Sequence, residues 1–357
     1  MANARVNRLR QLMSEQNLEA IIIGSEHNRR YLSGFTGSSG TLLITLQDSI
    51  LLTDFRYTTQ AGEQAAGFEI VEHGAKSMAA VKDLLAAKGL KQAAFEQDHV
   101  VFGEYSAWSE TLGDIRLVPT SGLVERLRMI KDEAELQVMQ EAADLADAAF
   151  SHVLKLIGPG AKESDIALEL EIFMRSRGAT SSSFDTIVAS GVRSAMPHGV
   201  ASGKLIGEGE FVTLDFGAYY KGYCSDLTRT VVTTNASDQH RRIYDIVLEA
   251  QLNALANIRP GMTGKEADAL ARSVITSYGY GEQFGHSTGH GLGMEVHEMP
   301  RLSVLGDTIL TPGMTVTVEP GIYISGFGGV RIEDDIVITE SGIKILTSSP
   351  KELLIVG

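Results

Sequence analysis

The sequence predicts a small α/β domain followed by a larger α+β domain that contains an internal duplication. Three observations support this prediction. The length of 357 residues suits two domains of ordinary size. Short apolar runs alternate with helix-like segments in the first third of the chain. In the rest of the chain, two blocks of sequence recur at nearly equal offsets, which indicates a structural repeat.

The first domain is expected over residues 1–124. Its apolar runs are bounded by Gly, Ser and Asp turns, and its amphipathic segments have the helical period. The predicted strands are 20–23, 41–46 and 49–54, and the predicted helices are 3–17 and 76–89. The Gly/Ser stretch 34–40 lacks the GK[ST] ending and the basic residue of a phosphate-binding loop, so we interpret it as a structural turn.

The second domain is expected over residues 125–357. A charged segment, 125–132, is interpreted as a linker that leads into a long helix at about 133–156. IGPGAKESDIA at 157–167 then matches IRPGMTGKEAD at 258–268, with an offset of 101. GEFVTLDFGAY at 209–219 matches GMTVTVEPGIY at 313–323, with an offset of 104. Two copies of helix, Pro-Gly turn, helix and strand hairpin predict a pseudo-twofold domain.

Composition excludes several classes of protein. Hydrophobic residues make up 43% and charged residues 21%, as in an ordinary globular protein. The net charge of −14 argues against a nucleic-acid partner, because a phosphate-tracking surface needs clustered Lys and Arg. No secretory signal or membrane span is evident, so a cytoplasmic protein without membrane partners is expected. The single cysteine, Cys224, excludes an intrachain disulfide and a multi-cysteine zinc site.

Two acidic residues flank a turn in the first copy of the repeat. A hairpin centred near Tyr220-Lys221 would set Asp215 opposite Asp226, with Cβ atoms about 4.5–5.5 Å apart. Two carboxylates this close repel each other unless a cation intervenes. The inference depends on register, because a slip of one residue would move Asp226 to the other face.

The second copy repeats the arrangement. Glu319 is expected at the end of one strand and Glu333 within the next, with Arg331 on the same face as Glu333. Asp215 and Glu319 occupy equivalent positions, so they should face each other near the local axis. A cleft between the two halves is a common place for a ligand site.

Imidazoles lie in the sequence between these hairpins. GHSTGHGLGMEVHEMPR carries His286, His290 and His297 among four glycines, and MPHG adds His198 from the first copy. So many glycines argue against a helical zinc-binding pair, but they permit close approach of the backbone to a site.

The acids and one imidazole suggest a metal pair. Four carboxylates and one neutral histidine carry −4, which balances two divalent cations. Oxygen-rich ligands without sulfur suit manganese or similar ions more than structural zinc. Two metals about 3.5–4 Å apart can activate a bridging water and polarise a carbonyl oxygen. Nearby histidines can donate protons or hold the developing oxyanion.

These residues resemble the pita-bread metallopeptidases, the fold shared by methionine aminopeptidase, aminopeptidase P and prolidase. The strings LDFG, SDLTRT, HSTGHGLG, VEPGIY and RIEDD carry the resemblance, which covers roughly residues 130–357. The family's metal ligands fall, in order, on Asp215, Asp226, His290, Glu319 and Glu333. The N-terminal part resembles the creatinase-type accessory domain. Creatinase itself lacks the metal ligands, so a creatinase-like activity is disfavoured.

The resemblance also implies roles for other residues. His198 and His297 would line the substrate pocket, where one binds or protonates the peptide. Glu319 would be the general base. Arg301 resembles an arginine of prolidases that holds the free carboxylate of the substrate, a task that suits a guanidinium fork. The remaining substrate-binding candidates are His286, Tyr323 and Arg331, and Arg331 would also support Glu333 electrostatically. Cys224 is expected to be a small buried neighbour of Asp226.

The resemblance implies a dinuclear-metal peptidase that hydrolyses the Xaa-Pro bond, foremost in dipeptides. Manganese is the expected metal, with cobalt or zinc as alternatives, and a homodimer is expected. Aminopeptidase P, which acts on longer Xaa-Pro peptides, is the close alternative. A non-catalytic peptide-binding module would be expected to lose ligands, and none is missing here. Methionine aminopeptidase is disfavoured by the long N-terminal domain.

Overall fold

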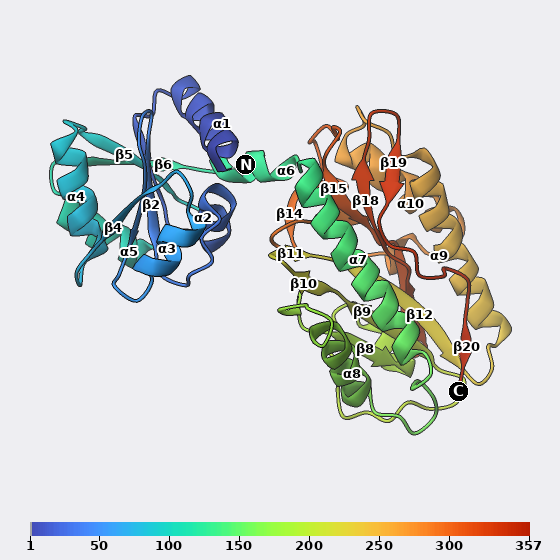
Figure 1. The fold of residues 1–357 in the computed structure, drawn as a ribbon. Helices are drawn as coiled ribbons and strands as arrows, with labels where there is room; N and C mark the ends of the chain where they lie inside the picture. Colours follow the sequence, from blue (N-terminus) through green and yellow to red (C-terminus); the bar gives the residue numbers. More distant parts are fainter. Residues whose placement is uncertain (1) are drawn as a thin grey trace. The chain divides into compact units, whose positions relative to one another are not determined.

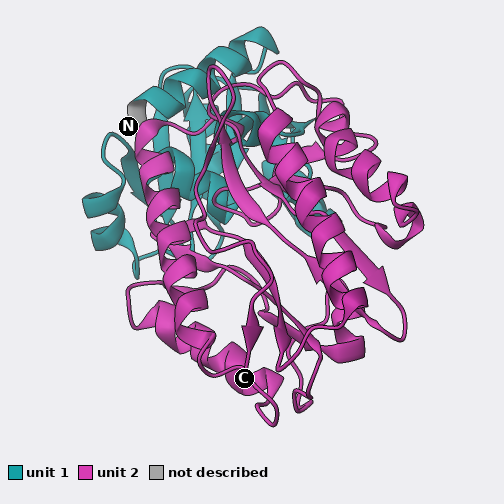
Figure 2. Ribbon diagram, turned by 90° about the vertical axis from the view of Figure 1, so that its right-hand side faces the viewer, with its two compact units in different colours: residues 1–128 teal, residues 129–357 magenta. Residues whose placement is uncertain are grey.

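The structure, a computed structural model, describes residues 2–357. The chain divides into two compact units, residues 1–128 and 129–357 (Figures 1 and 2). The segment expected to be a linker is instead largely helical, as α6 (Leu123–Met129). Two of its side chains are bound within the first unit, because the amide of buried Asn28 donates to Glu125 at 2.6 Å and accepts from Arg128 at 2.8 Å.

The first unit is a mixed six-stranded sheet in the order β4-β3-β2-β1-β5-β6. Its strands are β1 (Ala20–Ile23), β2 (Thr41–Thr45), β3 (Ser49–Thr53), β4 (Glu69–Glu72), β5 (Gln92–Glu96) and β6 (Arg116–Thr120). Its helices are α1 (Ala2–Glu15), α2 (Glu26–Ser33), α3 (Thr58–Gln64), α4 (Ser77–Ala87) and α5 (Phe102–Leu112). The predicted strands and helices are confirmed. The uninterrupted apolar run of β1 is buried along its whole length, since it pairs antiparallel with β2 and parallel with β5.

The second unit begins with the long predicted helix. The Asp132 carboxylate caps it by accepting the backbone N–H of Glu135. The Glu135 carboxylate in turn accepts the backbone N–H of Asp132. The first half consists of α7 (Glu133–Val153), α8 (Glu163–Arg175), β7 (Ser181–Ser182), β8 (Ile187–Ser190), the short 3-10 helix η1 (Gly191–Ala195), β9 (Phe211–Phe216), β10 (Ala218–Tyr220), β11 (Tyr223–Cys224) and β12 (Leu227–Thr233). Phe150, Leu170 and Leu214 join the two helices to one sheet in a single apolar core. The order of this sheet is β20-β12-β9-β8, in which β20 is the C-terminal strand Ile355–Val356.

The second half repeats this layout with a helix pair packed on a sheet. Its elements are α9 (Asp238–Asn257), α10 (Gly264–Ser277), η2 (Gly281–Gln283), β13 (Gly289–Gly291), β14 (Glu298–Leu302), β15 (Thr315–Val318), β16 (Gly321–Ile324), β17 (Gly328–Arg331), β18 (Asp334–Ile338), β19 (Ile343–Ile345) and β20 (Ile355–Val356). Val247, Ala271 and Val316 lie in its core, over the sheet β14-β13-β15-β18-β19. None of the helices in the described part of the chain is both long and apolar enough to cross a membrane.

Backbone hydrogen bonds confirm the predicted duplication. In the first half, the N–H of Gly160 donates to the carbonyl of Ile206 at 2.8 Å. In the second half, the N–H of Gly261 donates to the carbonyl of Leu310, also at 2.8 Å. The donors are offset by 101 residues and the acceptors by 104, as in the repeated sequence blocks. The same turn therefore docks against the same segment in both halves.

A buried arginine joins strands from both halves. Arg229 on β12 is 1% exposed and pairs with Asp334 at 2.9 Å. Its guanidinium also donates to the carbonyl of Glu333 and, at 2.7 Å, to that of Ser349. A buried charge that loses its partner is costly, so this pair fixes β12, the start of β18 and the C-terminal segment in one arrangement.

We predict that Arg229→Ala lowers the free energy of unfolding by about 3–5 kcal/mol. It removes the buried partner of the Asp334 carboxylate, which keeps only its pair with Lys351 at 3.1 Å, and it leaves the carbonyls of Glu333 and Ser349 without their donor. Arg175→Ala is the matched control. Arg175 pairs with Glu171 at 3.0 Å on the exposed face of α8, and its loss should cost less than about 1 kcal/mol. Urea denaturation followed by circular dichroism measures both changes. Equal destabilisation by the two substitutions would contradict the structural role of Arg229.

Candidate metal centre

The first acid-bearing hairpin has a different register from the one predicted. Asp215 pairs with Thr228, so the predicted pairing of Asp215 with Asp226 is wrong. The reason is the turn. Lys221 and Gly222 form it with φ values of 49° and 91°, one residue later than expected, as a two-residue turn with both central residues at positive φ requires. Asp226 lies two residues before Thr228, so its side chain still projects on the same face as Asp215.

The second hairpin contributes the other two acids. Glu319 directly follows β15, as predicted. Glu333 lies between β17 and β18, not within a strand as predicted. Its N–H donates at 3.1 Å to the carbonyl of Thr228 in the first hairpin, so it is not engaged in the ladder of its own hairpin. This bond joins the two halves at the point where the acids meet.

The histidine-rich segment reaches the acids through a short strand, β13, and it is not helical, as its glycines predicted. Gly289 and Gly291 flank His290 in β13, and both sit against neighbouring backbone. A Cβ atom would lie 1.9 Å from the carbonyl oxygen of Thr317 at Gly289, and 2.2 Å from that of Met299 at Gly291. Only glycine permits such close packing, and it brings the His290 imidazole to the two hairpins.

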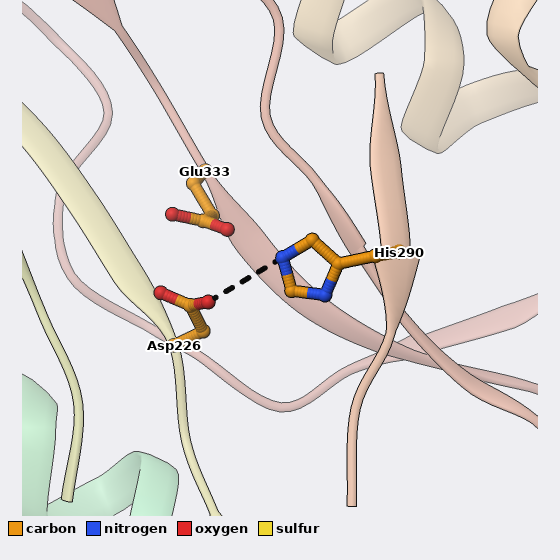
Figure 3. A group of neighbouring side chains, drawn as sticks. All are labelled: Asp226, His290 and Glu333. Carbon is orange, nitrogen blue, oxygen red and sulfur yellow. Dashed lines mark ion pairs between the residues drawn. The ribbon is translucent and has the colours of Figure 1, made fainter. Parts of the chain in front are cut away.

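Asp226, His290 and Glu333 converge, with one ligand atom from each lying within 4.8 Å of the others (Figure 3). His290 Nε2 lies 3.7 Å from Asp226 Oδ2 and 3.4 Å from Glu319 Oε1. His290 Nδ1 lies 3.0 Å from the Gly291 carbonyl oxygen, which can only accept, so Nδ1 carries the proton. The lone pair of Nε2 is therefore directed at the acids, as a metal ligand requires.

Unpartnered oxygens indicate that a cation fits this group. Asp215 Oδ1, Asp226 Oδ1 and Glu333 Oε1 are buried without a hydrogen-bond partner. Buried polar atoms are nearly always partnered, so three such atoms on neighbouring acids need an explanation. A divalent cation bound by carboxylate oxygens and one imidazole would supply the missing partner for each.

Burial and neighbouring charges shift the pKa values of these groups. Burial, followed by the neighbouring carboxylates, raises the pKa of Asp226 and of Glu333 well above their usual values. Burial raises the pKa of Glu319 from 4.5 to about 8. Burial also lowers the pKa of His290 to about 4, which keeps its imidazole neutral. Crowding therefore leaves protons on the acids and a free lone pair on the histidine.

A hydrogen-bonded chain supports the fourth acid. Arg331 donates from Nη2 to Asp215 Oδ2 at 2.5 Å and from Nη1 to the Tyr323 hydroxyl at 2.6 Å. His286 Nδ1 donates to the Ser287 carbonyl at 2.8 Å, so its Nε2 accepts the Tyr323 hydroxyl proton at 2.9 Å. The donor and the acceptor of every hydrogen bond between Ser287 and Asp215 are thus defined. Arg331 supports Asp215 more closely than Glu333, its expected partner.

A cavity of about 570 Å³ collects the predicted residues. The site residues that line it are His198, Asp215, Asp226, His286, His290, His297, Arg301, Glu319, Arg331 and Glu333. Tyr323 does not line the cavity and instead contacts it through His286 and Arg331. The side chains of His198, His297 and Arg301 are exposed, while the His297 ring lies 4.4 Å from that of His290. Buried acids thus form the floor of the cavity, and exposed histidine and arginine side chains form its walls.

Two supporting residues were not identified from the sequence. Thr228 donates to Glu333 Oε2 at 2.6 Å and accepts from Arg331 Nε at 3.1 Å. Asp335 accepts the backbone N–H of Asp226 at 2.9 Å. Their positions in SDLTRT and RIEDD, two residues from one ligand, were the available signal. Cys224 is buried as predicted, and burial raises the pKa of its thiol to about 12.

Comparison with protein families agrees with the two-unit structure. A profile described as metallopeptidase family M24 matches residues 137–340. A second profile, described as the creatinase/prolidase N-terminal domain, matches residues 5–130. Together they cover the larger part of both units.

Individual relatives match along nearly the whole chain. A structure of a Xaa-Pro dipeptidase from Bacillus anthracis is 54% identical, covers 100% of both chains and superposes with a TM-score of 0.98. An X-Pro aminopeptidase structure from Thermotoga maritima is 40% identical, covers 96% of this chain and 99% of its own, and has a TM-score of 0.91. A Xaa-Pro dipeptidase from Pyrococcus horikoshii is 38% identical over 99% of each chain.

We predict that metal binding releases protons. The pKa of Glu319 is raised to about 8, so below that pH the metal-free site favours the protonated form, and a divalent ion must displace the proton. Calorimetric titration with manganese, in buffers of different ionisation enthalpy, should show larger proton release at about pH 6.5 than at about pH 9. Glu319→Gln, which cannot ionise, should release fewer protons. Binding enthalpies that do not depend on the buffer would contradict this account.

Proposed function

The chain belongs to metallopeptidase family M24, and from this membership we propose that it hydrolyses the peptide bond before proline, foremost in Xaa-Pro dipeptides. One observation carries the proposal. Asp226, His290 and Glu333 converge beside a cavity of about 570 Å³, and the two acids, together with Asp215, leave buried oxygens unpartnered. A site built only to bind peptides would have no use for uncompensated buried acids.

We propose that Asp215, Asp226, His290, Glu319 and Glu333 hold two divalent ions, foremost manganese, with cobalt or zinc as alternatives. The mainly oxygen ligand set supports this choice. When bound, such a pair lowers the pKa of water and polarises the scissile carbonyl. Arg331 and Thr228 would orient Asp215 and Glu333 through the hydrogen bonds described above.

The catalytic residues proposed from the chain are Glu319, His198 and His297. Glu319 is the general base, since its carboxylate lies at the cavity beside His290, where it can accept a proton from the attacking water. His198 and His297 are exposed at the cavity wall, where an imidazole N–H can donate a hydrogen bond to the substrate and an imidazolium can give its proton to the leaving amine. Burial lowers the pKa of His297, which favours its neutral form.

The substrate would be bound by His198, His286, His297, Arg301, Tyr323 and Arg331. Among these, Arg301 determines the preference for dipeptides in our proposal. It lies on β14 at the cavity with its side chain exposed, where a guanidinium can bind the free carboxylate of a proline. The Bacillus anthracis relative, a Xaa-Pro dipeptidase, supports this assignment.

Release of the first residue from longer Xaa-Pro peptides is the second candidate function. The Thermotoga maritima relative, described as an X-Pro aminopeptidase, has the same fold at 40% identity. We further propose a cytoplasmic homodimer, for which the single cysteine and the family resemblance are the support.

We predict that Arg301→Ala impairs hydrolysis of a Xaa-Pro dipeptide much more than hydrolysis of a Xaa-Pro-Xaa tripeptide. A charged hydrogen bond to a carboxylate contributes about 1.5–3 kcal/mol, so kcat/KM for the dipeptide should fall about 10- to 150-fold. The tripeptide presents no carboxylate at the proline, and its rate should change little. Steady-state kinetics with manganese-loaded protein measures both.

Arg242→Ala, at an exposed position on α9, serves as the control for loss of an arginine and should change neither activity. Equal losses of kcat/KM on the dipeptide and the tripeptide in Arg301→Ala would contradict the proposal that Arg301 binds the substrate carboxylate. A wild-type protein that cleaved tripeptides faster than dipeptides would favour the aminopeptidase assignment.

A further inference from the structure

One wall of the cavity is a loop outside the regular sheets. We call residues 191–201 the His198 loop, because they carry His198 at the cavity. The loop starts with η1 and ends before Ser202, and Pro197, His198 and Val200 line the cavity. Pro197 also accepts a hydrogen bond at 3.2 Å from Arg331, the residue that binds Asp215. The position of this loop therefore bears directly on the site.

Hydrophobic burial does little to fix the loop. Its large apolar side chains, Val192, Met196 and Val200, are 55%, 54% and 48% exposed. Its strand pairing is limited to an isolated bridge between Ile187 and Val200. Since apolar contact and strand ladders are the usual sources of order, the loop depends on polar contacts instead.

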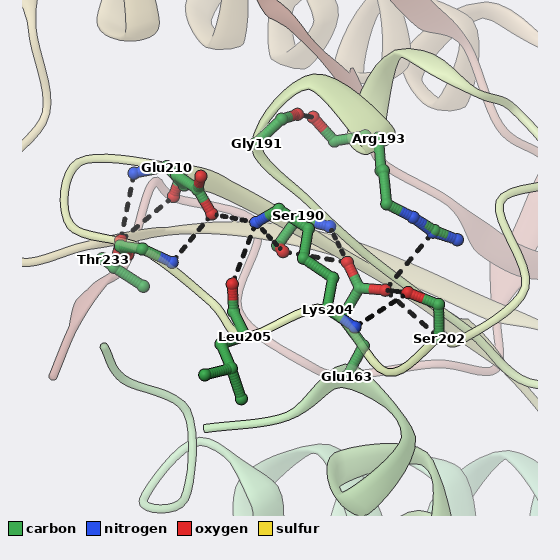
Figure 4. Close-up of polar contacts among 11 residues, drawn as sticks. Glu163, Ser190, Gly191, Arg193, Ser202, Lys204, Leu205, Glu210 and Thr233 are labelled. Carbon is green, nitrogen blue, oxygen red and sulfur yellow. Dashed lines mark hydrogen bonds and ion pairs between the residues drawn. The ribbon is translucent and has the colours of Figure 1, made fainter. Parts of the chain in front are cut away.

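Glu163 supplies those contacts at both ends of the loop (Figure 4). Its side chain is fully buried at the start of α8. Oε1 accepts the N–H and the hydroxyl of Ser190, both at 2.8 Å. Oε2 accepts the N–H of Ser202 at 3.1 Å and its hydroxyl at 2.6 Å. One carboxylate therefore ties the residue before the loop to the residue after it.

Arg193 extends this clamp into the loop. Its Nη1 lies 3.3 Å from Glu163 Oε2 and its Nη2 donates to the Val200 carbonyl at 2.7 Å. Lys204 lies close by, but its charge is already paired with Glu210 at 2.6 Å. Arg193 is thus the cation that compensates the buried Glu163, and it does so from within the His198 loop.

The second half of the duplication shows why the first half needs a carboxylate. The N–H of Glu163 donates to the carbonyl of Lys204 at 3.1 Å, and in the second half Gly264 donates in the same way to Thr308 at 3.0 Å. Glu163 and Gly264 are therefore equivalent. A Cβ at Gly264 would lie 2.0 Å from the carbonyl oxygen of Arg301, so backbone fills that space.

The corresponding segment of the second half is held by strand pairing. There, β14 pairs with β13, and Arg301 lies opposite His290. The His198 loop has no such ladder. Gly329 and Arg331 bind Ser194 and Pro197 in its middle, and the Glu163 side chain holds its two ends. The two walls of the cavity are thus held by different means at equivalent positions.

We propose that Glu163 is a positioning residue that clamps the His198 loop and so places His198 at the substrate. This inference rests on the proposed peptidase function. Glu163 contacts neither the metal ligands nor the cavity in the structure, so it acts through the loop. Misplacement of a reacting or binding group by about 1 Å can cost about 100-fold in rate.

The test compares Glu163→Gln with Glu171→Gln, the same change at an exposed position on α8. The amide would place a donor against the donors of Ser202 and Arg193. We expect kcat/KM for a Xaa-Pro dipeptide to fall about 10- to 100-fold in Glu163→Gln and less than about twofold in the control.

His198→Ala combined with Glu163→Gln should be no slower than His198→Ala alone, because both changes act through one side chain. Additive losses, or wild-type activity in Glu163→Gln, would overturn the proposal.

Two readouts do not need activity. Hydrogen–deuterium exchange should rise in residues 191–201 of Glu163→Gln and stay unchanged in α7 and β9, and manganese affinity by calorimetry should match the wild type. Ser202→Ala removes only one bond of the clamp and should produce smaller changes in the same direction, which keeps the test decisive if Glu163→Gln does not fold. A wild type without activity on any proline peptide would defeat the proposed function, whereas the exchange result would still decide the clamp. Unchanged hydrogen–deuterium exchange of residues 191–201 in both Glu163→Gln and Ser202→Ala would overturn the proposed clamp.

Discussion

Repulsion among buried carboxylates is the constraint on which the rest of this structure depends. Asp215, Asp226, Glu319 and Glu333 share one cavity, with Arg331 as the nearest buried cation. Two unit charges about 4 Å apart interact with about 4 kcal/mol at the effective dielectric of a protein surface, so several such pairs oppose folding unless protons or cations neutralise them. Burial raises the pKa of Glu319 to about 8, and repulsion from Asp215 adds to this rise. The unpartnered oxygens of the neighbouring acids reflect the same crowding.

The duplicated fold holds the four carboxylates close together, despite their repulsion, by fixing the backbone that carries them. Each half delivers two acids on a hairpin, and the bond from Glu333 to Thr228 joins the hairpins at the site. Behind the site, Arg229 binds the carbonyls of both Thr228 and Glu333, so its charge holds the two chain segments together without reaching the cavity. Arg229 therefore fixes the backbone near the acids from the side away from the cavity. The acid side chains keep unpartnered oxygens that can bind cations.

The sequence was sufficient for the acids but not for their support. Period-two alternation placed Asp226 on the correct face even though the turn at Lys221-Gly222 shifted the pairing by two positions, because an even shift preserves the face. Glu333 leaves its strand because of a bond to the other half, which no local pattern encodes. The supporting roles of Thr228, Arg229 and Glu163 could not be predicted for the same reason. Their hydrogen-bond partners lie up to 121 positions away in the chain.

The two halves place equivalent acids, Asp215 and Glu319, at the proposed metal site, but they differ where the substrate would bind. The duplicated fold therefore brings carboxylates to the site from both sides. A peptide has distinct ends, so a symmetric pocket would bind it equally well in either direction and lose selectivity. Divergence at one equivalent position, Glu163 in one half and Gly264 in the other, lets a clamped loop with His198 face a paired strand with Arg301. Directional binding of a small peptide can thus arise from a single break in the symmetry that built the metal site.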